Sequence, residues 1–436
     1  MGVALLAVLS TSSSLHAGPA AVATPAPEKS GDWCTWLSGK PGTVYKGDND
    51  FLQELNFFGR FQWQAAYVMG NDSNGYGFSD DHTEVRRFRL GMQAKFLNYF
   101  KVKANVNLVD DQSNSILAWP GGRSLGWGYE DFDEAYISFN AAKAFGISGL
   151  DALDISYGRL KHTLGYEAHE SSKKLLTPER SAIANKVYGS YRPTGIKIDA
   201  ATGAWDFTAA LYSTDRPSRA LDNVDFIGGW NDGLAYYASV GYQATDELSF
   251  LWDFIYNDAN GDLAQPNRYD SIFDYKWATS IAAVYEQDQW GVIANLIYGD
   301  NGGPDNLVGT GNNRRPKREG DFWGVVIMPY YWIVEDKLQA VVRYQYAGSE
   351  NDQGIRVNSR YLRRDHGPVA NANLVASGGG RGDEHHSIYA GLNYLICGHN
   401  LKLQAGVEYE YLNTPGQGID GDLTATTLWF ALRSYF

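Results

Sequence analysis

Alternation of apolar and polar residues with a period of two constrains this chain more than any other feature. Successive side chains of a β-strand point to opposite faces of the sheet, so such alternation predicts a strand with two unlike faces. Most even positions between residues 54 and 66 are polar, and the odd positions carry Leu55, Phe57, Gly59, Phe61, Trp63, Ala65 and Tyr67. One face of this segment suits lipid and the other suits water.

The same alternation recurs along the chain in segments separated by polar, glycine-rich stretches. Sixteen such segments predict an all-β fold, a 16-stranded antiparallel transmembrane β-barrel. Residues 55–67 are the first, and the others are 88–96, 100–108, 135–139, 153–157, 194–200, 205–213, 234–242, 248–256, 275–285, 290–298, 322–332, 338–346, 388–396, 401–411 and 426–436.

The connections between these segments alternate in length. Short ones centre on Asn98, Ala142, Thr202, Asp246, Asp288, Asp336 and Gly398. Long ones span 70–82, 110–129, 163–190, 214–233, 258–274, 300–320, 347–385 and 413–423. Outer-membrane barrels have short periplasmic turns and long extracellular loops, so this alternation predicts the same orientation here, in the outer membrane of a Gram-negative-type bacterium.

Composition agrees with membrane-spanning strands. Aromatic residues make up 14% of the chain, which suits the interfacial girdles of such barrels. No run of 18 apolar residues occurs, so no helix is expected to span a bilayer. The net charge of -13 argues against a nucleic-acid binder, because contact with phosphates needs a basic surface.

A soluble β-sandwich or a β-helix would also show alternating strands. A sandwich of this length should divide into domains of about 100–150 residues, and no linker or shift in composition marks a boundary. A β-helix should show a fixed sequence repeat, and none occurs.

Three parts of the chain are expected. Residues 1–23 resemble a signal peptide, with an apolar stretch and a cleavage site after Ala17 or Ala23. The basic start is missing, which a truncated N terminus would explain. Residues 24–50 form a periplasmic segment, and 51–436 form the barrel. The apolar alternation that ends at Phe436 resembles the signal that outer-membrane assembly machinery recognises.

Parity assigns a set of basic residues to the lumen. If the apolar positions of the early strands face lipid, the residues between them face inward, where charge is tolerated and tunes selectivity. Because the last strand closes on the first, four adjacent strands would share one basic wall that forms an anion path: Arg60, Arg87, Arg89, Lys95, Lys101, Lys103 and Arg433. The alternative is a generic water-filled lining without solute preference.

Acidic residues are also expected inside. Parity puts Asp253 opposite the basic wall, which would create a transverse field, and puts Glu408 and Glu410 close to the last strand, where they would neutralise its charge. Arg159 and Lys161 are further candidates. Strict alternation aims Arg159 outward, so an inward position requires a bulge near Gly158.

No catalytic residue, metal ligand set or cofactor motif is predicted. His385 and His386, with scattered serines, are the notable candidates for a hydrolase, and no GxSxG, HExxH or Cys/His cluster accompanies them. We therefore expect a non-enzyme without metal or cofactor.

Two cysteines are present, Cys34 before the first strand and Cys397 in the last short turn. The predicted topology places both at the periplasmic rim, and strand 15 is only two strands from strand 1. Strands are about 4.8 Å apart, and the residues between Cys34 and the first strand span that distance easily. A disulfide is therefore a candidate, and two free thiols are the alternative.

Three short motifs follow one another in a recognisable order. They are VRRFRLGMQAKF at 85–96, YGRLKHTLGYE from Tyr157 and TPERSAIAN from Thr177. This order resembles the phosphate-selective porin family, and the resemblance extends from about residue 50 to the C terminus.

The resemblance implies a trimer of 16-stranded barrels in outer-membrane lipid, through which small hydrophilic solutes or anions such as phosphate diffuse. It also implies that the third long connection folds inward as the constriction, with Lys173, Lys174, Arg180 and Lys186 on it. Because the whole chain is acidic, the preference for phosphate stays open, and a sugar-selective porin or a structural or adhesive barrel are the alternatives.

Overall fold

The computed structural model describes residues 32–109, 132–189, 192–214, 230, 233–258, 271–273, 275–302, 318–356, 361–362, 381–415 and 421–436. The expected signal peptide and the expected connection 110–129 lie outside these residues. Within the described ranges, no helix is long and apolar enough to cross a membrane.

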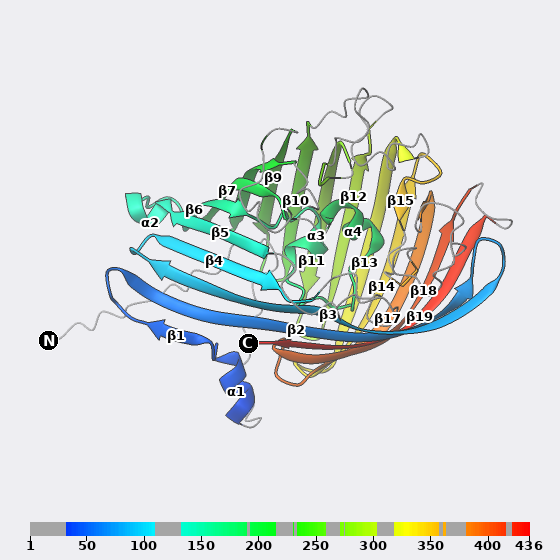
Figure 1. The fold of residues 1–436 in the computed structure, drawn as a ribbon, viewed down its shortest axis with the longest axis horizontal. Helices are drawn as coiled ribbons and strands as arrows, with labels where there is room; N and C mark the ends of the chain where they lie inside the picture. Colours follow the sequence, from blue (N-terminus) through cyan, green and yellow to red (C-terminus); the bar gives the residue numbers. More distant parts are fainter. Residues whose placement is uncertain are drawn as a thin grey trace, which may run out of the picture.

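Sixteen strands form one closed antiparallel sheet (Figure 1). Neighbours in sequence are neighbours in the sheet, and β19 pairs with β2 to close the ring. The strands are β2 (Leu52–Asn71), β3 (Gly77–Phe96), β4 (Phe100–Asn107), β5 (Phe132–Asn140), β6 (Ala152–Arg159), β7 (Thr194–Thr202), β8 (Trp205–Ser213), β9 (Leu234–Gln243), β10 (Leu248–Asn257), β11 (Trp277–Glu286), β12 (Trp290–Asp300), β13 (Asp321–Val334), β14 (Leu338–Ser349), β17 (Glu384–Leu395), β18 (Leu401–Asn413) and β19 (Asp422–Tyr435).

Each of the sixteen predicted segments overlaps one strand of the barrel, because a closed sheet with lipid outside and polar groups inside imposes the period of two. The prediction of a long connection over 70–82 is wrong. β2 and β3 continue to a tight turn at 72–76, where the Asp72 carboxylate accepts hydrogen bonds from the backbone N–H groups of Asn74 and Tyr76 at 2.9 Å. The outward positions at the start of β3, such as Ser79 and Asp81, are polar and exposed, so this stretch lacks the apolar alternation that identifies the other strands.

Most of the short turns use left-handed backbone conformations or a brief helix. Asn98 and Asp336 have φ of 64° and 55°, a region that Asn and Asp tolerate better than most residues. The turn predicted around Ala142 is the helix α2 (Ala141–Phe145), whose N-cap Asn140 accepts from the backbone N–H of Lys143.

An N-terminal arm extends the sheet at one rim. It consists of α1 (Asp32–Ser38) and β1 (Thr43–Lys46), and β1 pairs with residues 54–56 of β2. The pairing of β19 with β2 ends at Tyr435 opposite Arg60, so the start of β2 would be an open edge without β1. The arm therefore covers hydrogen-bonding groups that an edge strand would leave exposed. In Figure 1 it lies beside the barrel, near the C terminus.

The segment between β6 and β7 folds into the barrel, as the resemblance implies. This inward segment, residues 160–189, contains α3 (Tyr166–His169) and α4 (Ala182–Tyr188), which Figure 1 shows among the barrel strands. Its side chains Leu160, Leu164, Ile183 and Val187 join a buried apolar cluster with lumenal residues of the strands, such as Ile297 and Phe322. A small sheet of β15 (Ile355–Arg356) and β16 (Arg381–Gly382) lies outside the barrel order. The barrel is thus partly filled by its own chain.

Candidate channel lining and constriction

The inward segment is fixed to one side of the barrel by buried polar contacts. Asp253 on β10 accepts hydrogen bonds from the backbone N–H of Gly165 at 2.9 Å and from the Tyr237 hydroxyl at 2.8 Å. Its other close contact is His169 Nε2, 2.8 Å from Oδ1. On β12, Asn295 accepts from the backbone N–H of Tyr166 at 3.1 Å. These contacts hold α3 and the residues before it.

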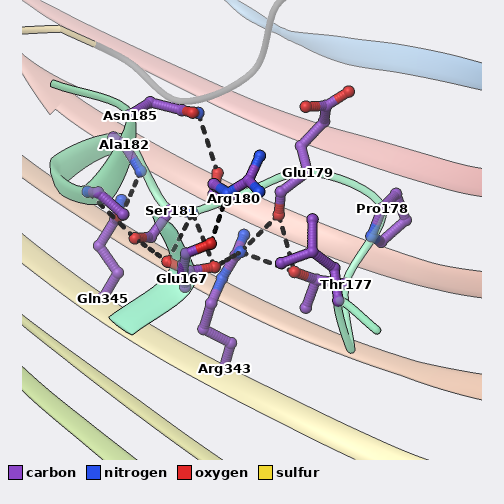
Figure 2. A network of polar contacts seen from close by, with 12 residues as sticks. Glu167, Thr177, Pro178, Glu179, Arg180, Ser181, Ala182, Asn185, Arg343 and Gln345 are labelled. Carbon is purple, nitrogen blue, oxygen red and sulfur yellow. Dashed lines mark hydrogen bonds and ion pairs between the residues drawn. The ribbon is translucent and has the colours of Figure 1, made fainter. Parts of the chain in front are cut away.

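The N-terminus of α4 is held in a second set of contacts, shown in Figure 2. The Glu167 carboxylate accepts from the Ser181 backbone N–H at 3.0 Å and also from the Ser181 hydroxyl. Gln345 on β14 accepts from the backbone N–H groups of Ala182 and Ile183. The orphan donors of the helix start are therefore satisfied by its N-cap and by the barrel wall.

Arg343 on β14 is the central cation of this network. Its side chain is 1% exposed, and it donates to Thr177 Oγ1 at 2.9 Å, to the Glu179 carbonyl at 2.7 Å and to Glu408 Oε1 at 2.8 Å. Glu167 lies 3.5 Å away (Figure 2). A buried guanidinium without such partners would be strongly unfavourable, so the inward segment and Glu408 stabilise each other through it.

The neighbouring strands continue this attachment. Lys402 Nζ and Gln404 Nε2 on β18 donate to the Leu175 carbonyl at 2.7 and 3.1 Å. Arg433 on β19 is buried, and it donates to Gln62 Oε1 at 2.7 Å and to the Pro178 carbonyl. We call the lumenal side of β10, β12, β14, β18 and β19 the covered wall, because the inward segment lies against it.

The predicted acidic residues all belong to the covered wall. Asp253, Glu408 and Glu410 point inward, as parity requires, and are 0%, 1% and 0% exposed. Asp253 contacts the inward segment directly, Glu408 pairs with Arg343, which binds that segment, and Glu410 lies 3.4 Å from His385 Nε2. They face the chain's own donors rather than the basic residues across an open lumen, because residues 160–189 occupy the intervening space.

The other side of the lumen carries half-buried basic residues. We call the lumenal side of residues 54–60 of β2, residues 87–95 of β3, and β4 and β5 the open wall. Arg60 donates to Ser172 Oγ at 2.7 Å, and Arg87 donates to Gln62 Oε1 at 2.8 Å. Lys95 pairs with Glu54 at 2.9 Å and Lys103 with Glu134 at 2.8 Å, while Lys101 makes no ion pair with any residue that the structure describes.

Two register shifts add charges that strict alternation hides. The pairing of β2 with β3 skips Arg86, because Gln62 pairs with Arg87 and Trp63 with Val85. Arg86 therefore turns inward and binds Glu179 of the inward segment, with Nε 2.6 Å from Oε1. In the same way, the pairing of β4 with β5 skips Asp133. A bulge reverses the parity of the strand beyond it, so the sequence pattern alone could not place either residue.

Asp133 joins two guanidinium groups, one of which, Arg192, lies over the ring of Tyr188 at the end of the inward segment. Its carboxylate lies 2.6 Å from Arg89 and 2.9 Å from Arg192, and Asn105 donates to it at 3.0 Å. One carboxylate charge thus serves two cations, which leaves the group positive. Arg192 lies just before β7, outside the alternating segments, and a motif for its position is not visible in the sequence.

Three cations surround the ring of Tyr188 at the end of α4. The Arg180, Arg192 and Lys161 groups lie 4.7, 5.3 and 5.6 Å from its centroid. Burial alone would raise the pKa of the Tyr188 phenol, but the charges of Arg192, Lys161 and Arg180 outweigh burial and lower the pKa to about 7. Burial and the neighbouring arginines lower the pKa of Lys161 to about 8.

The remaining predicted cations have distinct positions. Lys173 is half-buried and Lys174 is exposed, so both keep access to water, whereas Arg180 is buried and donates to the Glu167 carbonyl at 2.6 Å. Lys186 donates to Asn301 Oδ1 at 2.6 Å.

The bulge that Arg159 needed is absent from the pairings of β6, which are continuous with β5 and β7. Gly158 instead has φ of 138°, a conformation that is almost restricted to glycine, and Arg159 is half-buried at the end of the strand.

Cys34 and Cys397 form a disulfide with a Cα–Cα distance of 5.1 Å, which fastens α1 to the turn between β17 and β18.

Solved structures with the same fold are outer-membrane proteins. The outer membrane channel DcaP of Acinetobacter baumannii aligns with 12% identity and a TM-score of 0.52 over 90% of this chain and 99% of that chain. OprB of Pseudomonas putida aligns with 12% identity and a TM-score of 0.53 over 88% and 94%. The anion-selective porin from Comamonas acidovorans aligns with 11% identity and a TM-score of 0.50 over 88% and 99%. Such low identities establish the fold alone.

The search of curated proteins gave no match. The model of the family described as phosphate-selective porin O and P matches residues 56–299. This match spans more than half of the chain and includes β2 to β12, the inward segment and all three motifs that carry the resemblance. The chain therefore belongs to the phosphate-selective porin O and P family, a family of channels of the Gram-negative outer membrane.

Proposed function

We propose that this channel passes anions in preference to cations, along the open wall. The observation that carries the proposal is the contrast in burial between the two walls. Arg60, Arg87 and Lys101 are half-buried beside the inward segment, whereas Asp253 is buried against it, Glu408 against Arg343 and Glu410 against His385. A solute in the lumen then meets the field of the cations more strongly than that of the acids.

The constriction would lie where residues 160–189 approach the open wall. There Arg60 contacts Ser172, and Arg89 and Arg192 share Asp133. Paired guanidinium groups that keep excess positive charge are suited to phosphate and other oxyanions, because their planar donors match such oxygens. Phosphate is therefore the first solute to test, as the family description also suggests.

The orientation and assembly belong to the same proposal. We propose that the short turns and the disulfide-linked arm lie in the periplasm, that the long connections lie outside the cell, and that three copies assemble in outer-membrane lipid. We also propose that residues 1–23 are removed as a signal peptide and that 24–50 remain as a periplasmic segment.

The test is a reversal-potential measurement on the purified protein in a planar bilayer with a potassium chloride gradient, followed by a potassium phosphate gradient. The potential should have the sign of an anion-selective pore in both salts. A potential near zero or of cation-selective sign would contradict the proposal and leave the basic residues as a generic lining.

A further inference from the structure

Two aromatic rings lie on the open wall, where the alternation would lead one to expect polar residues only. The inward positions of β2 from 54 to 64 are Glu54, Asn56, Phe58, Arg60, Gln62 and Gln64, so Phe58 is the single apolar member of that face. On β5 the inward residue Tyr136 lies between Glu134 and Ser138. Both rings are half-buried. Tyr136 packs in part against the buried apolar cluster, and the rest of its surface and that of Phe58 lie beside the lumen, where an apolar ring is unfavourable without a partner.

The backbone makes room for the ring of Phe58. Phe58 pairs with Gly91 on β3, and a Cβ atom at residue 91 would lie 2.6 Å from Phe58 Cζ. Any other residue at 91 would push the ring away from the wall. Glycine thus lets the ring lie across β3 toward β4, where Lys103 Nζ is 5.9 Å from its centroid.

The same lysine lies close to the second ring. Lys103 pairs with Tyr136 in the β4–β5 register, and its Nζ is 5.9 Å from the Tyr136 centroid. Lys101 Nζ is 5.8 Å from that ring. Both distances are near the outer limit of about 6 Å for a cation–π contact, which is too long for the ammonium groups to rest on the rings. We call Phe58, Lys101, Lys103 and Tyr136 the aromatic–lysine patch.

The two lysines of the patch differ in charge balance. Lys103 is 2.8 Å from the Glu134 carboxylate, so its charge is compensated. Lys101 makes no ion pair with any described residue, although it lies beside Lys95 in the β3–β4 register. The patch therefore offers one ammonium group without an ion pair among the described residues, with Asp154 as the carboxylate that its charge acts on, and this group is flanked by aromatic surface. Such an arrangement suits a carboxylate that carries an aromatic body.

We propose that the aromatic–lysine patch is a binding site for aromatic carboxylates that pass through the channel. The proposal rests on the anion preference proposed above and narrows its solute class. The carboxylate would pair with Lys101, while the arene packs against Tyr136 and Phe58 in offset or edge-to-face geometry. Inorganic phosphate would use the guanidinium groups and gain nothing from the rings.

The experiment measures block of the chloride current by sodium benzoate and by sodium cyclohexanecarboxylate, which have equal charge and similar size. Wild-type protein should bind benzoate about two- to tenfold more tightly, judged by the half-blocking concentration, because an aromatic pair adds about 0.5–1.5 kcal/mol to area burial. Equal half-blocking concentrations would overturn the proposal.

Variants assign the effect to the patch. F58L and Y136L should each raise the half-blocking concentration of benzoate about two- to tenfold and leave that of cyclohexanecarboxylate nearly unchanged. F58Y and Y136F keep an aromatic ring and should keep the block, even if a leucine variant fails to fold. Phe57 and Tyr157 face outward and are more than 40% exposed, so F57L and Y157L are matched controls that should bind as wild type does.

The outcomes separate this inference from the proposed function. A cation-selective reversal potential contradicts the anion preference. The ratio of the half-blocking concentrations of benzoate and cyclohexanecarboxylate does not depend on that preference, because the two carboxylates have equal charge. Block by a neutral oligosaccharide that disappears in F58L and Y136L, with benzoate block unchanged, would instead identify a sugar site and overturn the proposal.

Discussion

The two walls of this barrel use charged residues for opposite purposes. On the covered wall, Arg343 and Asp253 are buried and bind the inward segment, and Glu408 is buried against Arg343; on the open wall, Arg60, Arg87 and Lys101 keep access to the lumen. Sequence parity treats both groups alike, as inward charges. An inward charge therefore lines the pore only where no segment of the chain covers it.

Removal of Arg343 should have the largest effect. R343M leaves the buried carboxylates of Glu408 and Glu167 without their cation, and loss of one member of a buried ion pair is expected to destabilise by about 3–5 kcal/mol. The inward segment should detach from β14, so thermal unfolding should occur at lower temperature and single-channel conductance should rise.

The control for this variant is R87M on the open wall, whose side chain is half-buried. It should unfold close to wild type. If R343M and R87M unfold alike and conduct alike, the division into a covered and an open wall is wrong. Addition of E408Q to R343M should recover part of the loss, because it removes one of the unpaired buried charges.

Charge reversal on the open wall should have the next largest effect. In R60E/R87E the charge of the lumen changes by two units at each site. The interaction energy between a permeating ion and one unit charge about 7 Å away in water is roughly 0.6 kcal/mol. The anion-to-cation permeability ratio should therefore fall about tenfold or more. The shift in reversal potential should shrink at 1 M salt, where the Debye length is about 3 Å.

Reversal of Lys40 and Lys46 on the N-terminal arm is the matched control, because both lie outside the barrel strands. D253N on the covered wall gives the complementary test. Its carboxylate is fully buried, so selectivity should change little while the noise of the open channel rises. A large selectivity shift in D253N would mean that the covered wall also faces the solute.

The sequence predicts the strands of the barrel, but it does not predict which of the inward charges stay exposed to the lumen. Alternation identifies all sixteen strands, because lipid on one side and polar groups on the other act on every one of them. It fails at residues 70–82, where outward positions such as Ser79 are polar, and at Arg86 and Asp133, where bulges break the parity. Which inward charges are covered depends on contacts between distant residues, such as Arg343 with Thr177, and no local pattern encodes them.

A smaller effect is expected from pH. The pKa of the Tyr188 phenol is lowered to about 7 and that of Lys161 to about 8, so both groups lose a proton as the pH rises from 6 to 9. Deprotonation of Tyr188 adds a negative charge and deprotonation of Lys161 removes a positive charge, so each lowers the net charge beside Arg180 and Arg192 by one unit. The permeability ratio for anions should therefore fall with rising pH, by about threefold for each group.

Y188F should abolish the part of this change near pH 7 and keep the part near pH 8. K161R, which stays protonated, should do the reverse. A titration in Y188F that matches wild type would show that the phenol does not ionise in the channel.

The smallest effect on conduction is expected from the disulfide. The disulfide between Cys34 and Cys397 joins the N-terminal arm to the rim of the barrel. Strand β1 pairs with residues 54–56 of β2 and not with a strand across the lumen. C34S/C397S should therefore leave conductance and selectivity at wild-type values, while protease cleaves the chain between α1 and β2 more readily. The periplasm is oxidising, so protein purified without reductant should carry the bond, and thiol titration of the unfolded, unreduced chain should find none. Two titratable thiols would contradict the bond, and a changed conductance in the double variant would place the arm in the solute path.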